Sequence, residues 1–463
     1  MGCDELMGRR VRRKPLPQAE LVADIMDLAD NGCGVARLDG KVVFVTGALP
    51  GERVRLRLTW SSREFDKGIA VAIDRASPDR VTPSCEHFGY CGGCALQHLA
   101  PSAQIAFKQK QLLDSLSRIG GVVPAEIATA ITGPVWNYRR RARLAVHRRY
   151  KPDRFDIAAL GEHTTSKIRV GFRERDRPAV ARLSHCEVLD ARVGQQLQSL
   201  AALIDGLSIS EQIPQIEIAM ADAAVALILR VLKPPSAGDV QALAEYATRQ
   251  GFDLYLQPAG LDSVTPLSAP TAPLDYSPDG SALRLAFTPV DFIQINAAVS
   301  QAMVRQALDW LAPQPGDALL ELFAGLGNFS LPLAAAGARV TAVEGEAGLV
   351  ARGRGNAERN GLQIDFVQAD LFKPNAQAAW LRKPFDLALI DPPRAGAREV
   401  LPLLAATRPQ RIVYVSCHPA TLARDAGVLV REYGYRLSRA GVLDMFPHTA
   451  HIESMALFER PWR

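Results

Sequence analysis

Short apolar runs separated by glycine dominate the beginning of the chain. From Ala19 onward they read L-V-A-D-I-M-D-L, G-V-A-R-L, K-V-V-F-V, R-V-R-L-R-L and I-A-V-A-I, and Asp39-Gly40 is a strong hairpin turn signal between two of them. Five short strands in succession predict a small closed β-barrel of the oligonucleotide-binding type over residues 16–77. Its arginines at 53, 55 and 57 would share one face of a strand, either to bind RNA or simply as a solvated surface.

The middle of the chain, residues 78–280, mixes helical and strand patterns and predicts an α+β domain. An amphipathic helix is expected over 102–118, with Ser102 as N-cap and Gly120-Gly121 beyond its end; it could pack on the last domain. The arginine-dense stretch 138–151 alternates as strands do. Two further strands, a helix over Asp239–Arg249 ended by Gly251, and the strand F-D-L-Y-L follow. Residues 259–280, rich in Pro, Ser and Asp, predict a linker.

The last part of the chain, residues 281–463, alternates apolar strands with helices. This alternation predicts an α/β Rossmann-like domain with a mostly parallel, doubly wound sheet. Its strands are A-L-L-E-L-F, R-V-T-A-V-E, I-D-F-V-Q-A-D, F-D-L-A-L-I-D and R-I-V-Y-V-S-C. Ligands bind such sheets at the carboxyl ends of the strands, so the residues at these ends are the candidates for chemistry.

A glycine turn and two acids form the first candidate site. Gly325 and Gly327 follow the first strand, Glu344 ends the second and Asp370 ends the third. Glycines let a ligand approach the backbone at a helix N-terminus, and a carboxylate accepts hydrogen bonds from ribose hydroxyls. The chain has no G-x-x-x-x-G-K-S/T motif, and Ser330 stands where dinucleotide sites have a third glycine. An adenosyl group without a pyrophosphate fits better, which indicates S-adenosylmethionine.

Two further strands end in reactive residues. Cys417 follows R-I-V-Y-V-S, where a thiol is placed to act as a nucleophile, although an unpaired cysteine is also commonly a small buried hydrophobe. Asp391 opens D-P-P-R, where it could hydrogen-bond the edge of a base. Similar loops with an aromatic residue occur in enzymes that methylate exocyclic amines, but Arg394 replaces the aromatic. A purely structural turn remains an alternative for D-P-P.

Four cysteines form a candidate metal centre. Three of them lie in C-E-H-F-G-Y-C-G-G-C and the fourth in S-H-C-E-V-L: Cys85, Cys91, Cys94 and Cys186. Zinc sites usually come as two C-x-x-C pairs, so three clustered thiols with a remote fourth favour an iron–sulfur cluster over zinc. Cys3 and Cys33 have no assigned role.

Composition and charge narrow the class of protein. Hydrophobic residues make up 48% of the 463 residues and charged residues 22%, with a net charge of +5, as in soluble globular proteins. Basic residues gather in three runs, 9–14, 139–151 and 167–177, which favours RNA or DNA as a partner. No apolar stretch is long enough for a membrane span, and no apolar segment follows the basic start as in a secretory signal. We therefore expect a cytoplasmic protein, in which cysteines serve metal binding or catalysis.

Five motifs of the last domain resemble those of the RNA uracil-5 methyltransferases, in order and spacing. They are F-I-Q-I-N (292–296), L-F-A-G-L-G-N-F (322–329), D-P-P-R-A-G (391–396), V-S-C-H-P-A-T-L-A-R-D (415–425) and M-F-P-H-T-A-H-I-E-S-M (445–455). The four cysteines resemble the iron–sulfur branch that modifies large-subunit ribosomal RNA, and residues from Asn31 to Glu52 resemble the TRAM module. Ala324 and His418 depart from the family, which often has Cys and Asn there.

The resemblance implies an enzyme that uses S-adenosylmethionine to methylate C5 of a particular uridine in 23S rRNA. It implies a cysteine nucleophile at Cys417 that adds to C6, a base at Glu453, and a uracil site at Asp391 and Phe292. It also implies a [4Fe–4S] cluster on the four cysteines and a monomeric protein. Cofactor-binding positions would be Gln294, Phe323, Gly325, Gly327, Asn328, Glu344, Asp370 and Asp391. The alternatives are methylation of another rRNA or tRNA uridine, methylation of an exocyclic amine, and non-catalytic RNA binding.

Overall fold

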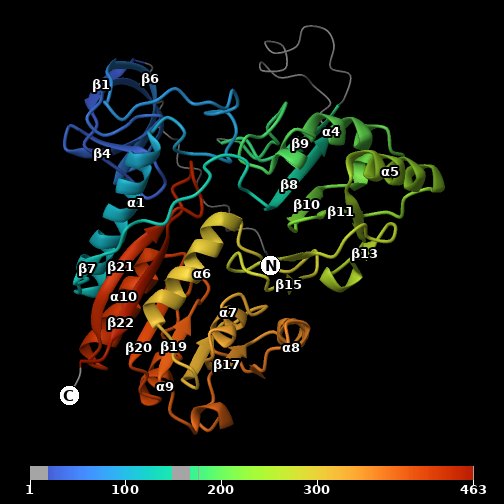
Figure 1. Ribbon diagram of the computed structural model, residues 1–463. Helices are drawn as coiled ribbons and strands as arrows, with labels where there is room; N and C mark the ends of the chain where they lie inside the picture. The colour runs from blue at the N-terminus through green and yellow to red at the C-terminus, as the bar shows by residue number, and fades with distance from the viewer. Residues whose placement is uncertain (1–18, 149–166, 176, 462–463) are drawn as a thin grey trace, which may run out of the picture. The chain divides into compact units, whose positions relative to one another are not determined.

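The computed structural model describes residues 19–148, 167–175 and 177–461 (Figure 1). The chain forms two compact units: the first holds the residues up to Thr82 together with Leu96–Ala100, and the second holds Pro83–Ala95 and everything from Pro101 onward. The basic run 9–14, Cys3, Arg149 and Lys151 lie outside the described residues. The expected boundary at 280/281 has no counterpart in this division and stays a prediction.

The first unit is built on one six-stranded sheet. Its strands are β1 (Leu21–Asp24), β2 (Asp27–Leu28), β3 (Gly34–Leu38), β4 (Lys41–Thr46), β5 (Arg53–Ser61) and β6 (Phe65–Arg75), in the order β1-β5-β6-β4-β3-β2. The two edge strands β1 and β2 are consecutive in the chain. Between them, Ile25 N bonds to Glu52 O and Met26 N to Val35 O, so the chain passes from one edge of the sheet to the other and closes it. The sheet is therefore a barrel with one more strand than predicted, because L-V-A-D-I-M-D-L bends into two.

Turn chemistry and one buried ion pair hold the barrel together. Asp39 and Gly40 both have positive φ, 49° and 80°, as the predicted tight hairpin between β3 and β4 requires. Glu52 is fully buried and accepts hydrogen bonds from Arg80 Nε and Nη2 at 2.5 and 2.8 Å. Burial works to raise the pKa of Glu52, but these bonds outweigh burial and hold the pKa below its usual value. The pair ties the chain after β6 to the barrel.

The arginines of β5 share an exposed face, as predicted, but that face is not purely basic. Arg55 pairs with Glu20 and Asp74 at 3.3 and 3.1 Å, and Arg53 lies 3.6 Å from Asp24. All these side chains are at least 39% exposed, so the pairs contribute little to stability. Their effect is to reduce the positive potential that β5 offers to a polyanion.

The second unit contains a mixed six-stranded sheet in its central part. The sheet has the order β13-β12-β11-β10-β8-β9, with β8 (Arg141–Arg148), β9 (Ile168–Gly171), β10 (Gln215–Met220), β11 (Val225–Arg230), β12 (Asp253–Gln257) and β13 (Thr265–Pro266). Helices α3 (Ala191–Gly194), α4 (Leu197–Asp205) and α5 (Ala237–Gln250) belong to this part. Ser236 and Asp239 form a capping box that begins α5, and Gly251 ends it at φ 70°. The helix thus matches its prediction and connects the parallel strands β11 and β12.

The last part of this unit is built on an eight-stranded sheet in the order β18-β17-β16-β19-β20-β22-β21-β7. Strands β16 (Ala318–Leu322), β17 (Arg339–Glu344), β18 (Asp365–Gln368), β19 (Leu387–Ile390) and β20 (Arg411–Ser416) are parallel. Strands β21 (Arg436–Leu443) and β22 (Glu453–Glu459) form an antiparallel end, and β7 (Glu126–Ile127) adds to it. Its helices are α6 (Ala297–Leu311), α7 (Ser330–Ala335), α8 (Ala347–Arg359), α9 (Leu401–Ala406) and α10 (Pro419–Arg431).

The helix expected over 102–118 is α1 (Pro101–Ser115), continued by a π-helical turn at Leu116–Gly120. Ser102 lies inside the first turn and is not the N-cap, because the helix already begins at Pro101. Leu112 and Leu116 pack in one apolar cluster with Leu422 and other residues of α10. A Cβ at Gly120 would lie 2.5 Å from the carbonyl oxygen of Ala423, so glycine allows this close approach. The helix after the cysteine motif therefore packs on the sheet that carries Cys417.

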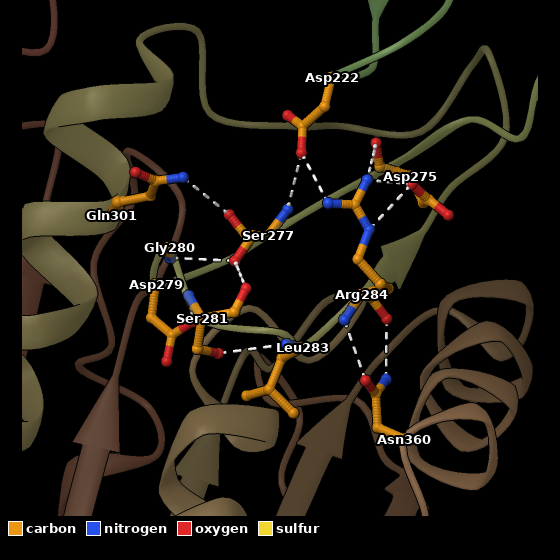
Figure 2. Close-up of polar contacts among 10 residues, drawn as sticks. All are labelled: Asp222, Asp275, Ser277, Asp279, Gly280, Ser281, Leu283, Arg284, Gln301 and Asn360. Carbon is orange, nitrogen blue, oxygen red and sulfur yellow. Dashed lines mark hydrogen bonds and ion pairs between the residues drawn. The ribbon is translucent and has the colours of Figure 1, made fainter.

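Just after the predicted linker of residues 259–280, Arg284 binds residues near the central sheet and at the end of α8 (Figure 2). Its guanidinium bonds to Asp222 Oδ2 at 2.9 Å and to Asp275 Oδ1 at 3.1 Å from Nε. Asn360, at the end of α8, accepts from Arg284 N at 2.9 Å and donates to Arg284 O at 2.8 Å, as a neighbouring strand would. The short strand β14 (Asp275–Tyr276) lies in the predicted linker, and its antiparallel partner β15 (Leu285–Ala286) follows it.

Part of the second and third basic runs is used inside the protein, while Arg143, Lys167, Arg173 and Arg177 are exposed. Arg141 and Arg143 share Glu217, Arg148 lies 3.7 Å from Asp205, and Arg169 is buried. The charge argument for a nucleic-acid partner is therefore weaker than the sequence indicated. Among the described residues, no helix is both long and apolar enough to cross a bilayer.

Candidate active site

The candidate residues gather at the carboxyl edge of the parallel strands. Phe323 follows β16, Glu344 ends β17, Asp391 follows β19 and Cys417 follows β20. The registers that pair Leu322 with Val343 and with Ile390 align these strand ends, so the segments that follow them leave one edge of the sheet together. The prediction that this edge carries the candidate residues agrees with this topology.

The glycine turn after β16 is held in an unusual backbone conformation. Phe323, Gly325 and Gly327 have φ angles of 64°, 56° and 95°, which is uncommon for a phenylalanine and marks a constrained segment. Gly325 N donates to Glu344 Oε2 at 3.0 Å, while Glu344 Oε1 accepts from Gly345 N and Glu346 N. The acid predicted to bind ribose thus also fixes the turn, and it remains partly exposed.

The third predicted acid, Asp370, shapes the next loop. Its Oδ1 accepts from Phe372 N at 2.9 Å and from Lys373 N at 3.2 Å. These bonds place the Phe372 ring 5.8 Å from that of Phe323, and Phe372 is 42% exposed. The structure therefore adds an exposed aromatic surface beside the glycine turn, which sequence reasoning missed; the aromatic residue two positions after the acid was the available signal.

The antiparallel strand β22 brings Glu453 to the end of β20. Ser416 pairs with Ser454, so the next position of this register sets Cys417 opposite Glu453. Glu453 is the first residue of β22 and only 4% exposed, whereas Cys417 is half-buried. Cys417 and Glu453, which are 36 positions apart in the sequence, thus lie opposite each other at this edge of the sheet.

Burial and like charge shift the titration of this group of residues. Burial raises the pKa of Asp391 to about 7. Burial, and then the charge of Asp391, raise the pKa of Glu453 well above its usual range. Burial also raises the pKa of the Cys417 thiol, as do the charges of Glu453 and Asp391, while Arg394 acts against both increases. Strongly perturbed groups at one place are typical of catalytic sites.

The loop that carries Asp391 and Arg394 is fastened to α10, the helix that follows Cys417. Asp425 is fully buried and accepts from Ala397 N and from Tyr414 Oη, both at 2.8 Å. Arg424 donates to Ala395 O at 3.0 Å. The R-D pair of the motif A-T-L-A-R-D therefore fixes the D-P-P-R loop relative to the cysteine.

A buried acid that the sequence analysis did not single out lies beneath the same edge. Glu321 of β16 is 1% exposed, and its carboxyl oxygen accepts a hydrogen bond from Ser330 Oγ. Burial, with smaller contributions from the charges of Asp391 and Glu344, raises the pKa of Glu321 to about 8. An acid within the apolar run A-L-L-E-L was the signal that could have identified it.

The remaining predicted residues occupy two different environments. Gln294 is half-buried, and its main-chain oxygen accepts from Arg140 Nε at 2.7 Å. Asn328 Oδ1, in the glycine turn, accepts from Tyr276 Oη at 3.1 Å. Phe292 is 70% exposed, so its ring is available to an incoming base and belongs to no core. The structure shows no contact that joins Phe292 to Cys417 among the described residues.

The four predicted metal-binding cysteines come together in the central part of the second unit. Cys91, Cys94 and Cys186 share one apolar cluster, and none of the cysteines of the described residues forms a disulfide. Burial, and then repulsion from the other three thiols, raise the pKa of Cys91 to about 12, which is only partly offset by a hydrogen bond from Gly93 N at 3.4 Å. A Cβ at Gly93 would come within 3.4 Å of Cys91 Sγ and 3.3 Å of the Phe172 ring, so glycine leaves room at the sulfur.

Comparison with known proteins identifies the family and the fold of the chain. The sequence profile of the tRNA (Uracil-5-)-methyltransferase family matches residues 279–374 and 377–461, and that of the TRAM domain matches residues 19–71. A solved tRNA (uracil-54, C5)-methyltransferase of Pyrococcus abyssi shares the fold, with a TM-score of 0.68 and 23% identity over 95% of this chain and all of that one.

Two full-length relatives carry the same name, 23S rRNA (uracil(1939)-C(5))-methyltransferase RlmD. The one from Alkalilimnicola ehrlichii is 48% identical over 98% of this chain and 99% of its own length. The one from Xanthomonas axonopodis pv. citri is 49% identical over 97% of this chain and 99% of its own. At this similarity over both whole lengths, the chain belongs to the RlmD family of 23S rRNA (uracil-C5)-methyltransferases.

Proposed function

We propose that this protein transfers a methyl group from S-adenosylmethionine to C5 of a uridine in 23S rRNA, and that the uridine is position 1939, as in the names of its relatives. The observation that carries the proposal is the pairing of a thiol with a buried carboxyl group at the carboxyl end of β20. Methylation at a ring carbon needs such a pair, whereas methylation of an exocyclic amine does not need the thiol.

The proposed reaction begins with Cys417. Uracil C5 is weakly nucleophilic, but addition of the Cys417 thiolate to C6 moves the C5–C6 π electrons toward O4 and makes C5 an enolate carbon. Bound S-adenosylmethionine supplies an electrophilic methyl group. The thiol must first release its proton to solvent, and burial and two carboxylates make this release harder because they raise the pKa of Cys417. Arg394 is the cation that counters them, and the same loop holds Asp391 for the uracil edge.

Glu453 completes the proposed reaction by removing the C5 proton. A carboxylate whose pKa lies well above its usual range is a stronger base than a solvated glutamate, which suits abstraction from carbon. As that proton leaves to Glu453, the C5–H electrons restore the C5–C6 double bond and the C6–S bond breaks. Cys417 is released, and the product is 5-methyluridine.

The proposed binding sites follow from the same edge of the sheet. The cofactor would lie against the glycine turn and Glu344, with Asp370 and the exposed Phe372 at the adenine end. Phe292, exposed on the segment before α6, would stack on the extruded uracil. The barrel of residues 19–82 would act as an RNA-binding module.

We also propose that Cys85, Cys91, Cys94 and Cys186 hold a [4Fe–4S] cluster. The fit rests on four cysteines whose thiolate forms would repel one another in an apolar setting, a repulsion that a cationic iron centre would relieve, and on the space left by Gly93. The N–H of Gly93 bonded to Cys91 Sγ is the kind of contact that tunes cluster potentials. Iron and acid-labile sulfide in anaerobically purified protein, with their loss in Cys186→Ala, would support the cluster; bound zinc without sulfide would contradict it.

The function is tested with 23S rRNA that carries 5-fluorouridine. Fluorine at C5 cannot leave as a proton, so the proposed adduct should persist through denaturing electrophoresis after incubation with S-adenosylmethionine. The adduct should vanish in Cys417→Ser and remain in Cys33→Ser, a cysteine in the barrel. Sequencing across the adduct identifies the uridine. Methyl transfer to ordinary RNA without any adduct would refute C5 chemistry and favour amine methylation through D-P-P-R.

A further inference from the structure

Among the residues that the structure describes, Arg140 is a buried cation that no anionic side chain pairs with. It directly precedes β8 and is 6% exposed, and its main chain is bonded to Ile295 O and Met220 N. Within the described residues, no carboxylate lies within ion-pair distance of its guanidinium, and Nη2 is buried without a hydrogen-bond acceptor. Buried charges are ordinarily paired, because desolvation of an unpaired ion costs several kcal/mol. An unpaired guanidinium at this depth therefore indicates an anion that the described part of the chain does not provide.

The acids nearest to Arg140 are already engaged. Asp222 is the one carboxylate whose charge acts on Arg140, and it raises the pKa that burial lowers. Its Oδ2, however, accepts from Arg284 Nη1 at 2.9 Å and from Ser277 N at 3.2 Å (Figure 2). Arg284 also holds Asp275. Asp222 and Asp275 are therefore both paired with Arg284, and neither forms an ion pair with Arg140.

The contacts that Arg140 does make lead to the cofactor side of the site. Its Nε donates to the main-chain oxygen of Gln294 at 2.7 Å, and its guanidinium lies 4.3 Å from the centre of the Tyr276 ring. The hydroxyl of Tyr276 in turn donates to Asn328 Oδ1 in the glycine turn. Gln294 and Asn328 are both predicted cofactor-binding residues. The guanidinium therefore contacts one of them directly and reaches the other through Tyr276.

We propose that Arg140 binds the carboxylate of the methionine moiety of S-adenosylmethionine. The ribose end of the cofactor is assigned to Glu344 and the adenine end to Asp370, which leaves the methionine tail for the opposite end of the turn, where Asn328 lies. A carboxylate at the end of a flexible chain is small enough to approach a residue that is only 6% exposed, whereas an RNA phosphate held between two sugars is not. The planar fork of arginine matches a carboxylate in two parallel hydrogen bonds.

The inference rests on the proposed function, since it assumes that S-adenosylmethionine is the methyl donor. Its test uses two ligands that differ only in this group: S-adenosylhomocysteine and its decarboxylated analogue, 5′-deoxy-5′-(3-aminopropylthio)adenosine. Calorimetric titration measures the affinity of both for the wild-type protein, Arg140→Gln and Arg143→Gln. The last is the control, because Arg143 has an exposed side chain and pairs with Glu217.

We expect Arg140→Gln to weaken S-adenosylhomocysteine binding by about 10- to 100-fold, the value of a charge-assisted hydrogen bond, and to leave binding of the analogue unchanged. Arg143→Gln should change neither affinity. An equal loss for both ligands, or no loss for either, would overturn the proposal and make Arg140 a structural cation. If the wild-type protein binds neither ligand, the proposed methyl donor itself is wrong, which separates the two failures.

Discussion

The raised pKa of Asp391 predicts that this residue destabilises the folded protein at neutral pH. Burial raises the pKa from 3.8 to about 7, so the folded state keeps a proton that the unfolded chain has already released. The free energy of unfolding is therefore unaffected by Asp391 below pH ~4. It falls by about 1.4 kcal/mol per pH unit above pH ~4 and levels off near the pKa of the folded state. The shift of about three units corresponds to about 4 kcal/mol.

Asp391→Asn keeps the shape of the side chain and removes its ionisation. The variant should match the wild type below pH ~4 and exceed its stability by up to about 4 kcal/mol above pH ~7, since Asn has no charge to desolvate. Urea unfolding across this range measures the difference. Glu358→Gln, which removes an exposed carboxylate on α8, is the control. Its free energy of unfolding should show the same pH dependence as that of the wild type. A pH-independent difference, or a variant less stable at neutral pH, would refute the argument.

Three further predictions concern other parts of the molecule. Glu453→Gln should lower turnover by about 10²- to 10⁴-fold and retain a covalent adduct on ordinary RNA, measured by denaturing electrophoresis; rapid release would contradict its role as base. Arg80→Met should lower the free energy of unfolding of the barrel, measured by thermal unfolding, by about 3–5 kcal/mol, because Glu52 remains buried without its partner. The loss should become smaller as the pH falls and Glu52 takes up a proton. A loss that does not change with pH would contradict the role of the ion pair. Gly93→Val should reduce iron and sulfide content, since its side chain would meet Cys91 Sγ and Phe172; normal content would disprove the fit.

The parallel core of the catalytic sheet could be predicted because its strands, apart from the edge strand β18, are buried on both faces. Runs such as R-I-V-Y-V-S are apolar along their length, and residues 411–416 form β20 as the pattern indicated. The barrel was predicted with one strand too few, since L-V-A-D-I-M-D-L carries no glycine or proline at its bend. Hydrophobic periodicity indicates which residues are buried, but it does not reveal where the chain changes direction within a continuous apolar run.

The partners of charged side chains could not be predicted, because they depend on tertiary contacts. The arginines of 139–151 read as one basic surface, yet Arg141 and Arg143 meet Glu217 of β10 and Arg140 is buried between the linker and the segment before α6. Sequence spacing gave no indication that a glutamate in a neighbouring strand would face them. Counting charges along a chain therefore overstates the potential of a surface whenever the opposite charges lie on an adjacent strand.

The position of Glu453 shows why the antiparallel end of the sheet matters for the proposed chemistry. In a wholly parallel sheet every strand begins at the edge away from the ligand, so a base next to Cys417 would have to come from a loop. Because β22 runs against β20, its first residue meets the last residues of β20. The backbone ladder on both strands then fixes the base more firmly than a loop could. The buried environment that raises the pKa of Glu453 follows from the same placement, since β22 lies between β20 and β21. Reversal of one strand thus supplies both the position and the basicity of the carboxylate.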